Sequence, residues 1–261
     1  MKAIILNDTS SSPHAGCKMT MDVFHSELDR VGVQVLGTVA MMHQDLEPLY
    51  SKFEKADLII VNGEGSIHHN NRSELLFVAE KFPCALVNCV FEANIPRPVT
   101  DKFIFKAARE SWSAKELGAM VVPDVVYAHP LLQGLRPSSK VIDFFCFTDS
   151  VLKKIGGDIR PATTPEAFVS MLSKYKFICT GRFHGIVVCS ALGIPFSTYA
   201  SNTWKNEALM NDIGTPHMFA SKREDAKDLL LQNTAPGRYI YSLLAAGKVK
   251  KMFEHIAEMK V

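Results

Sequence analysis

The chain has 261 residues, of which 47% are hydrophobic and 21% are charged, and its formal net charge is +2 at pH 7. This composition is ordinary for a globular protein and suffices for one large core or two small ones. The small charge and scattered basic residues argue against general nucleic-acid binding, and no apolar stretch approaches the ~18 residues that cross a bilayer.

Short apolar segments alternate with helical patterns in the first half. Residues 1–7 (MKAIILN) predict a buried strand, and a helix is predicted to follow residues 13–16 and to run to about residue 31. Residues 57–62 and 85–88 predict two more strands. Polar or glycine residues follow each strand, at the edge where ligands collect in open parallel sheets.

A proline-, glycine- and serine-containing segment at residues 129–139 predicts a boundary, giving two α/β lobes at residues 1–134 and 135–261. The second lobe is expected to begin with a strand at residues 140–147 and a helix around residues 164–172, with Pro165 in its first turn. Strands at 175–179 and 196–199 flank a helix at 186–192. Helical patterns follow at 224–231 and from 238 onward.

Arg182 and His184 lie between the predicted strand at 175–179 and the helix at 186–192. Backbone N–H groups and the positive end of that helix, together with the guanidinium, favour a phosphate or a carboxylate. Both side chains can face one ligand if the segment is extended or in an irregular first turn, which Gly181 and Gly185 permit. The alternative is that Arg182 pairs with a structural carboxylate and that His184 is a core histidine.

The motifs together resemble the polysaccharide pyruvyl transferases, over roughly residues 3 to 214. The matching segments are Asn7 with His14-x-Gly16-Cys17, DLIIVNGEGSIHH (57–69), Ala108-Arg-Glu-Ser-x-Ser113 with Leu117, Val122-Pro-Asp124, Thr180-Gly-Arg-Phe-His184, and Ser201-Asn202 with Lys205. The resemblance implies two Rossmann-like lobes facing each other across a cleft, a glycosyltransferase-B-type fold. The chain is short for the family, which leaves the acceptor open.

The resemblance implies a transferase that uses phosphoenolpyruvate as co-substrate and needs no cofactor. A donor with a carboxylate and a phosphate needs fixed cations, for which Arg182 and Arg109 are the candidates. His184 is the candidate general acid that protonates the methylene carbon, since an imidazolium can donate a proton near neutral pH. Glu64 is either the base for the acceptor hydroxyl or a structural cap of the segment that follows it.

Further residues are expected to bind substrate. Asn7 and His14 are expected on the acceptor side. Ser201, Asn202 and Lys205 are expected to hold the anionic groups of the donor, with a solvated helix lysine as the alternative for Lys205. The other expected substrate-binding residues are Gly63, Gly65, Ser66 and His68. Adjacent histidines point different ways and no carboxylate pattern accompanies His68 and His69, so no metal is expected. Asp124 is expected to brace the junction of the lobes.

Six cysteines, none in a C-x-x-C pair, predict reduced thiols, and no secretory signal begins the sequence, so a cytoplasmic protein is expected. A lipid-linked saccharide acceptor would place it at the inner face of the membrane. The last helix carries lysines beside apolar residues. It can lie peripherally on an anionic membrane, but the commoner arrangement packs its apolar side on the protein.

Two other functions fit the residues. The strongest rival is a glycosyltransferase that uses a nucleotide-activated sugar, such as an acidic keto-sugar, in polysaccharide or lipopolysaccharide synthesis, because the same cationic site would accept a nucleotide phosphate. The other is a saccharide-binding protein without catalysis.

Overall fold

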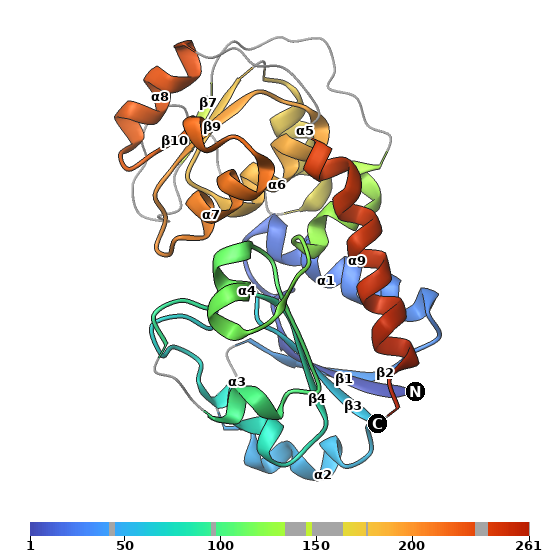
Figure 1. Ribbon diagram of the computed structural model, residues 1–261. Coiled ribbons are helices and arrows are strands. Elements are labelled where there is room, and N and C mark those ends of the chain that lie inside the picture. Colours follow the sequence, from blue (N-terminus) through green and yellow to red (C-terminus); the bar gives the residue numbers. More distant parts are fainter. Residues whose placement is uncertain are drawn as a thin grey trace. The chain divides into compact units, whose positions relative to one another are not determined.

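The structure is a computed structural model that describes residues 1–41, 45–94, 98–133, 145–147, 164–175, 177–232 and 240–260. It forms two compact units (Figure 1). Unit 1 comprises Met1–Ser11, Thr20–Val125 and Lys248–Val261, and unit 2 comprises Ser12–Met19 and Val126–Gly247. The predicted boundary between residues 134 and 135 lies outside the described residues.

Unit 1 contains a six-stranded parallel sheet in the order β2-β1-β3-β4-β5-β6. Its strands are β1 (Lys2–Asp8), β2 (Gln34–Ala40), β3 (Leu58–Asn62), β4 (Cys84–Cys89), β5 (Phe105–Ala108) and β6 (Met120–Val121). β3 and β4 are buried at every residue, which explains their continuous apolar sequences. Because β1 pairs with both β2 and β3, the strand order reverses beside β1, the position where open α/β sheets bind ligands.

The helices of unit 1 are short except for two that also contribute residues to unit 2. These two are α1 (Ala15–Arg30) and α9 (Ile240–Glu258). The short ones are α2 (Tyr50–Phe53), α3 (Glu74–Phe77) and α4 (Ser111–Leu117). Single 3-10 turns occupy Glu47–Leu49, Val78–Glu80 and Pro98–Lys102.

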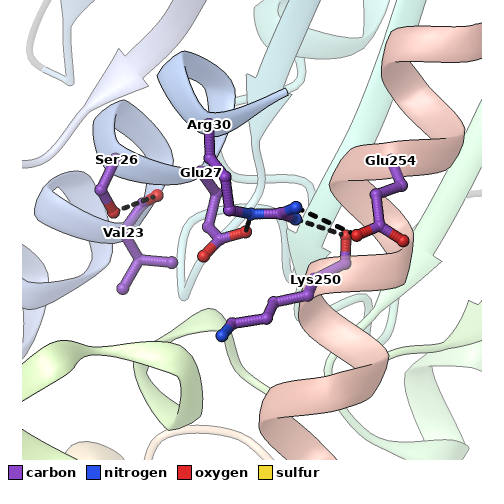
Figure 2. Close-up of polar contacts among 6 residues, drawn as sticks. All are labelled: Val23, Ser26, Glu27, Arg30, Lys250 and Glu254. Carbon is purple, nitrogen blue, oxygen red and sulfur yellow. Dashed lines mark hydrogen bonds and ion pairs between the residues drawn. The ribbon is translucent and has the colours of Figure 1, made fainter. Parts of the chain in front are cut away.

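The end of α9 packs against α1 within unit 1. The rings of Phe24 and Phe253 meet edge to face with centroids 5.5 Å apart, and both side chains are buried. Arg30 donates to Glu27 Oε2 at 2.7 Å, to Glu254 Oε1 at 3.0 Å and to the Lys250 carbonyl at 3.2 Å (Figure 2). This part of the last helix therefore packs its apolar side on the protein, as the commoner arrangement predicted.

The two leucines of α9 that lie in unit 2 differ from that prediction. Leu243 and Leu244 are 56% and 60% exposed. Among the described helices, none has the length and hydropathy to cross a membrane.

Unit 2 contains a four-stranded parallel sheet in the order β10-β9-β8-β7. Its strands are β7 (Phe145–Phe147), β8 (Ile178–Thr180), β9 (Phe196–Tyr199) and β10 (Phe219–Ala220). Its helices are α5 (Pro165–Ser173), α6 (Phe183–Leu192), α7 (Lys205–Ile213) and α8 (Arg223–Gln232), and its 3-10 turns are Val125–Ala128, Pro130–Leu132 and Pro216–Met218. Residues 140–144 of the predicted strand at 140–147 lie outside the described residues.

Local sequence signals explain where the helices of unit 2 begin and end. Thr164 caps α5 by accepting from Ala167 N at 3.3 Å, and Pro165 is its first residue, as predicted. α6 ends at Gly193, whose φ of 70° lies in the left-handed region that favours glycine. α6 begins at Phe183, three residues earlier than predicted, with Arg182 as its N-cap residue.

Candidate functional site

Polar side chains gather at the carboxyl edge of the sheet in unit 1. Asn7, Asn62 and Asn88 lie at the ends of β1, β3 and β4, and Arg109 follows β5 directly. All four are at most 2% exposed. Because neighbouring parallel strands end at the same edge, residues from four distant parts of the sequence meet there.

The three asparagines form a continuous hydrogen-bonded network. Asn7 Nδ2 donates to the Asn62 carbonyl at 2.6 Å and to Ser66 Oγ at 3.1 Å. Asn62 Nδ2 donates to the Asn7 carbonyl at 3.3 Å and to Glu64 Oε2 at 3.5 Å. Asn88 Nδ2 donates to Asn62 Oδ1 at 3.4 Å. The predicted substrate-binding residues Asn7 and Ser66 and the predicted base Glu64 therefore belong to one cluster.

The glycine loop after β3 is held close to β4. A Cβ atom on Gly63 would lie 2.6 Å from Cys89 Cβ and 2.7 Å from Cys89 Cα, so only glycine fits there. A Cβ on Gly65 would meet Arg109 Nη2 at 3.5 Å, an ordinary contact. Glu64, between them, is 5% exposed and has a φ of 27°. The first α-helix after it, α3, begins only at Glu74, with Ser73 as its N-cap residue.

Arg109, a predicted donor-binding cation, forms a buried ion pair. Its Nη1 donates to Asp124 Oδ2 at 3.0 Å, and the two side chains are 2% and 0% exposed. Asp124, which was expected at the junction of the lobes, thus balances the charge of Arg109 inside unit 1.

Glu110 is the N-cap residue of α4. Its Oε2 accepts from Trp112 N at 2.8 Å and from Ser113 N at 2.9 Å. Burial raises the pKa of the Glu110 carboxyl above its ordinary value, although the hydrogen bonds from Ser113 and Trp112 and the charge of Arg109 oppose that shift.

We expect Glu110→Gln to gain stability relative to the wild type as the pH rises above 4.5, the ordinary value for this carboxyl. A raised pKa in the folded state means that protonation stabilises the fold, so this contribution is lost with rising pH, whereas glutamine has no such dependence. Urea unfolding between pH 4.5 and 8, followed by fluorescence of the adjacent Trp112 in a Trp204→Phe background, measures the difference. A difference independent of pH would contradict this expectation.

In unit 2, Arg182 and His184 lie at the amino end of α6. Arg182 has an extended backbone with φ −86° and ψ 123°, and its N–H donates to Thr180 Oγ1 at 3.0 Å. His184 is in the first helical turn. Arg182 is therefore extended and His184 lies in the first helical turn, which is the condition stated above for both side chains to face one ligand. Gly181 contributes through close packing, since a Cβ there would lie 2.5 Å from Tyr199 Cε2.

His14 belongs to the same unit as Arg182. Arg182 Nη1 lies 2.9 Å from His14 Nδ1. A guanidinium can only donate, so Nδ1 of His14 is the acceptor and its ring is neutral in this arrangement. His14 was expected beside Asn7 in the first lobe; in the structure it lies in unit 2, next to Arg182.

Gly16, in the first turn of α1, lies directly against the ring of His184. A Cβ atom on Gly16 would be 2.2 Å from His184 Nδ1 and 2.3 Å from its Cγ. Cys17 follows, and its sulfur lies within 4.8 Å of a ring nitrogen of His184. The start of α1 therefore fixes the position of the imidazole.

We expect Gly16→Ala to destabilise the protein by about 1–3 kcal/mol, the usual cost of overpacking, because the new methyl group must displace the imidazole. Gly247→Ala, where a Cβ would meet nothing within 4 Å, is the matched control and should not be destabilised. Urea unfolding followed by Trp204 fluorescence, in a Trp112→Phe background, compares the two variants. Equal effects would show that His184 does not depend on Gly16.

The segment after β9 brings the other predicted anion-binding residues of unit 2 together. Lys205, the first residue of α7, donates from Nζ to Asn202 Oδ1 at 2.5 Å, and Ser201 Oγ donates to the same oxygen at 3.1 Å. Lys205 is only 9% exposed, so the alternative of a solvated helix lysine is wrong. The neighbouring Asn206, which the sequence analysis missed, donates to the Gly181 and Tyr199 carbonyls, each at 2.9 Å.

His68 and His69 do not point different ways, contrary to expectation. Their Nδ1 atoms are 2.9 Å apart and the rings meet edge to face. A backbone bridge joins His68 to Glu92, and His69 N donates to the Glu92 carbonyl at 2.8 Å.

The sequence profile of the family described as polysaccharide pyruvyl transferase matches residues 43–202. The chain belongs to the polysaccharide pyruvyl transferase family. It is accordingly a transferase, and its family acts in polysaccharide biosynthesis. No curated protein matches the sequence significantly.

Solved structures with a similar fold have low sequence identity to this family member. An uncharacterized protein from Klebsiella pneumoniae superposes with a TM-score of 0.55 and 17% identity, covering 80% of this chain and 87% of the other. A UDP-GlcNAc 2-epimerase from Neisseria meningitidis bound to UDP-GlcNAc gives a TM-score of 0.57 and 13% identity, covering 99% and 100%. The predicted α/β class with a glycosyltransferase-B-type fold is thereby confirmed.

Some buried polar residues of the candidate site were not predicted from the sequence. Asn62 and Asn88 are the last polar residues of otherwise apolar strands, and the apolar pattern predicts no more for them than a place in a strand. Their signal was present, because each lies at the carboxyl end of a buried strand in a parallel sheet, where ligands bind. Asn206 had no local signal, because it is buried by packing of α7 against β8 and β9.

Proposed function

We propose that this transferase moves a pyruvyl group from phosphoenolpyruvate to a saccharide of a cell-surface polysaccharide precursor and forms a cyclic ketal. The methylene carbon of the donor gains a proton and becomes the methyl group. Two hydroxyl oxygens of the acceptor form bonds to the neighbouring carbon, and the bond from that carbon to the phosphate oxygen breaks. The acceptor hydroxyls lose two protons; one balances the proton taken up by the carbon, and the other leaves with phosphate.

The arrangement of Arg182 and His184 at the amino end of α6 carries the proposal. Arg182 offers a guanidinium on the residue that begins α6, and a cation together with the amino end of a helix suits a phosphate or a carboxylate. His184, in the first turn of α6, is proposed to protonate the methylene carbon. Ser201, Asn202 and Lys205 are proposed to bind the anionic groups of the donor. That Arg109 also binds the donor remains a prediction, and Asp124 already balances its charge.

Glu64 is proposed as the base for the acceptor hydroxyls, with Asn7, Ser66 and the Gly63–Gly65 loop as acceptor-binding elements. Burial at 5% exposure and an unusual φ of 27° support a functional role, since carboxylates are seldom buried and backbone strain concentrates at functional sites. His14 and His68 remain predicted substrate contacts. A lipid-linked acceptor is part of the proposal.

Ligand-induced thermal stabilisation tests the donor. A ligand that binds only the folded state raises the melting temperature by mass action. We expect millimolar phosphoenolpyruvate to raise the melting temperature of the wild type and to have no effect on Arg182→Ala, with CMP, UDP and GDP as separate arms. A rise with one nucleotide alone would instead support the rival, a glycosyltransferase with a nucleotide-activated sugar. Phosphate release that requires a saccharide acceptor then tests the reaction.

A further inference from the structure

The asparagine network in unit 1 ends on the carboxylate of Glu64. The backbone N–H of Val125 donates to Asn88 Oδ1 at 3.3 Å, and Asn88 Nδ2 donates to Asn62 Oδ1 at 3.4 Å. Asn62 Nδ2 in turn donates to Glu64 Oε2 at 3.5 Å. The three side chains thus form a directed chain of donors from the segment after Asp124 to one carboxylate oxygen.

The network lies where the strand order reverses. Asn7 is the penultimate residue of β1 and Asn62 is the last residue of β3, and these two strands pair in the register Leu6 with Val61. The crevice beyond such a reversal is the usual ligand site of an open parallel sheet. The asparagines are therefore at the position where a ligand of unit 1 would bind.

The backbone supports the same conclusion. Asn7, Glu64 and Asn88 have φ values of 63°, 27° and 55°, in the region that favours glycine. Asparagine tolerates this region better than most residues, but glutamate does not. Strain of this kind persists where the surrounding structure holds it and is typical of functional sites.

Asn7 also offers an acceptor atom to which a ligand could donate a hydrogen bond. Its Oδ1 is buried and has no hydrogen-bond partner among the described residues, although its Nδ2 donates twice. A buried acceptor without a donor is costly, and a donor from a ligand removes that cost. A saccharide hydroxyl is such a donor, and ketal formation needs two hydroxyls close together.

We propose that Asn62 and Asn88 are positioning residues that hold Glu64 and Asn7 as the subsite for the two acceptor hydroxyls. Asn62 contacts both residues, through the Glu64 carboxylate and the Asn7 carbonyl, so it fixes their separation. One hydroxyl donates to Asn7 Oδ1, and the other loses its proton to Glu64. Asn88 keeps the Asn62 amide oriented with its N–H2 toward the carboxylate. The inference rests on the proposed function, because Glu64 is the base only in that reaction.

The test exchanges each amide for an isosteric carboxylate. Asn62→Asp replaces the donor that faces Glu64 with an acceptor and a negative charge, and a like charge at this distance favours protonation of Glu64. Asn88→Asp keeps the oxygen that accepts from Val125 and tolerates the positive φ, but it loses the donor to Asn62. Asn71→Asp, at an exposed asparagine outside the network, adds the same charge and is the matched control.

The readout is the carboxyl ¹³C titration of Glu64, assigned with Glu64→Gln, together with the pH profile of kcat/KM. We expect the titration midpoint and the acid limb of the profile to move up by about one pH unit in Asn62→Asp, by less in Asn88→Asp and not at all in Asn71→Asp. If Asn62 and Asn88 had a purely structural role, the two substitutions would lower the melting temperature and leave the Glu64 titration and the pH profile of kcat/KM unchanged. If Asn62→Asp does not fold, Asn88→Asp decides.

The two proposals fail separately. Suppose that the Glu64 titration shifts in the folded variants but that the wild type transfers no pyruvyl group. That result would overturn the proposed function and leave the positioning role of Asn62 and Asn88 toward Glu64 in place. An unchanged titration in folded Asn62→Asp or Asn88→Asp, with transfer intact, would overturn the positioning role alone.

Discussion

Replacing His184 with alanine is expected to lower kcat by about 10²- to 10⁴-fold, the usual contribution of a positioned general acid. The reason is that no proton donor would then lie in the first turn of α6, beside the anion site of Arg182. Saccharide-dependent phosphate release from phosphoenolpyruvate measures the loss. Stability should change little, because His184 is only partly buried.

His217→Ala is the matched control for this variant, since His217 lies in the same unit and is exposed. Its turnover should equal that of the wild type. The rise in melting temperature with phosphoenolpyruvate should persist in His184→Ala, because Arg182 is intact. Unchanged turnover in His184→Ala would remove His184 from the mechanism, and a lost thermal shift would assign it to donor binding instead.

Asp124→Ala is expected to destabilise unit 1 by about 3–5 kcal/mol, the largest effect on stability that we predict. The substitution leaves the guanidinium of Arg109, 2% exposed, without its carboxylate at 3.0 Å. Urea unfolding followed by the fluorescence of Trp112, in a Trp204→Phe background, reports on unit 1, because the two tryptophans of the chain lie in different units.

Asp101→Ala is the matched control for the buried pair. Asp101 Oδ1 lies 3.6 Å from Lys106 Nζ, and the Asp101 side chain is 83% exposed. Asp101→Ala should therefore lower the free energy of unfolding by less than about 1 kcal/mol. The double variant Arg109→Met with Asp124→Leu removes both charges and should recover much of the stability lost in Asp124→Ala. Equal losses in Asp101→Ala and Asp124→Ala would show that burial does not set the strength of the pair.

The elements with strong local signals could be predicted from the sequence. The apolar run before Asn62 and the strand at 196–199 were found because buried parallel strands need continuous apolar residues. The start of α5 at Pro165 and the end of α6 at Gly193 follow from the backbone angles that proline and glycine favour. These signals are local, so they act before any tertiary contact forms.

The site was only partly predictable, because its parts depend on distant contacts. Nothing near His14 in the sequence indicates that it meets Arg182, 168 residues away. The ion pair of Arg109 with Asp124 could not be found either, since it depends on how the segment after β6 returns to the end of β5. Asn62 and Asn88 lie in apolar strands, where periodicity assigns them to structure alone.

The order of segments along the chain has a consequence for biosynthesis. Unit 1 needs residues from Lys248 onward, which cover Phe24, but about 120 residues of unit 2 are translated first. At roughly 5–20 residues per second, the nascent chain carries that apolar face of α1 uncovered for about 6–24 s. During this interval the growing polypeptide should be a chaperone client, and unit 1 reaches its full stability only after α9 has left the ribosome.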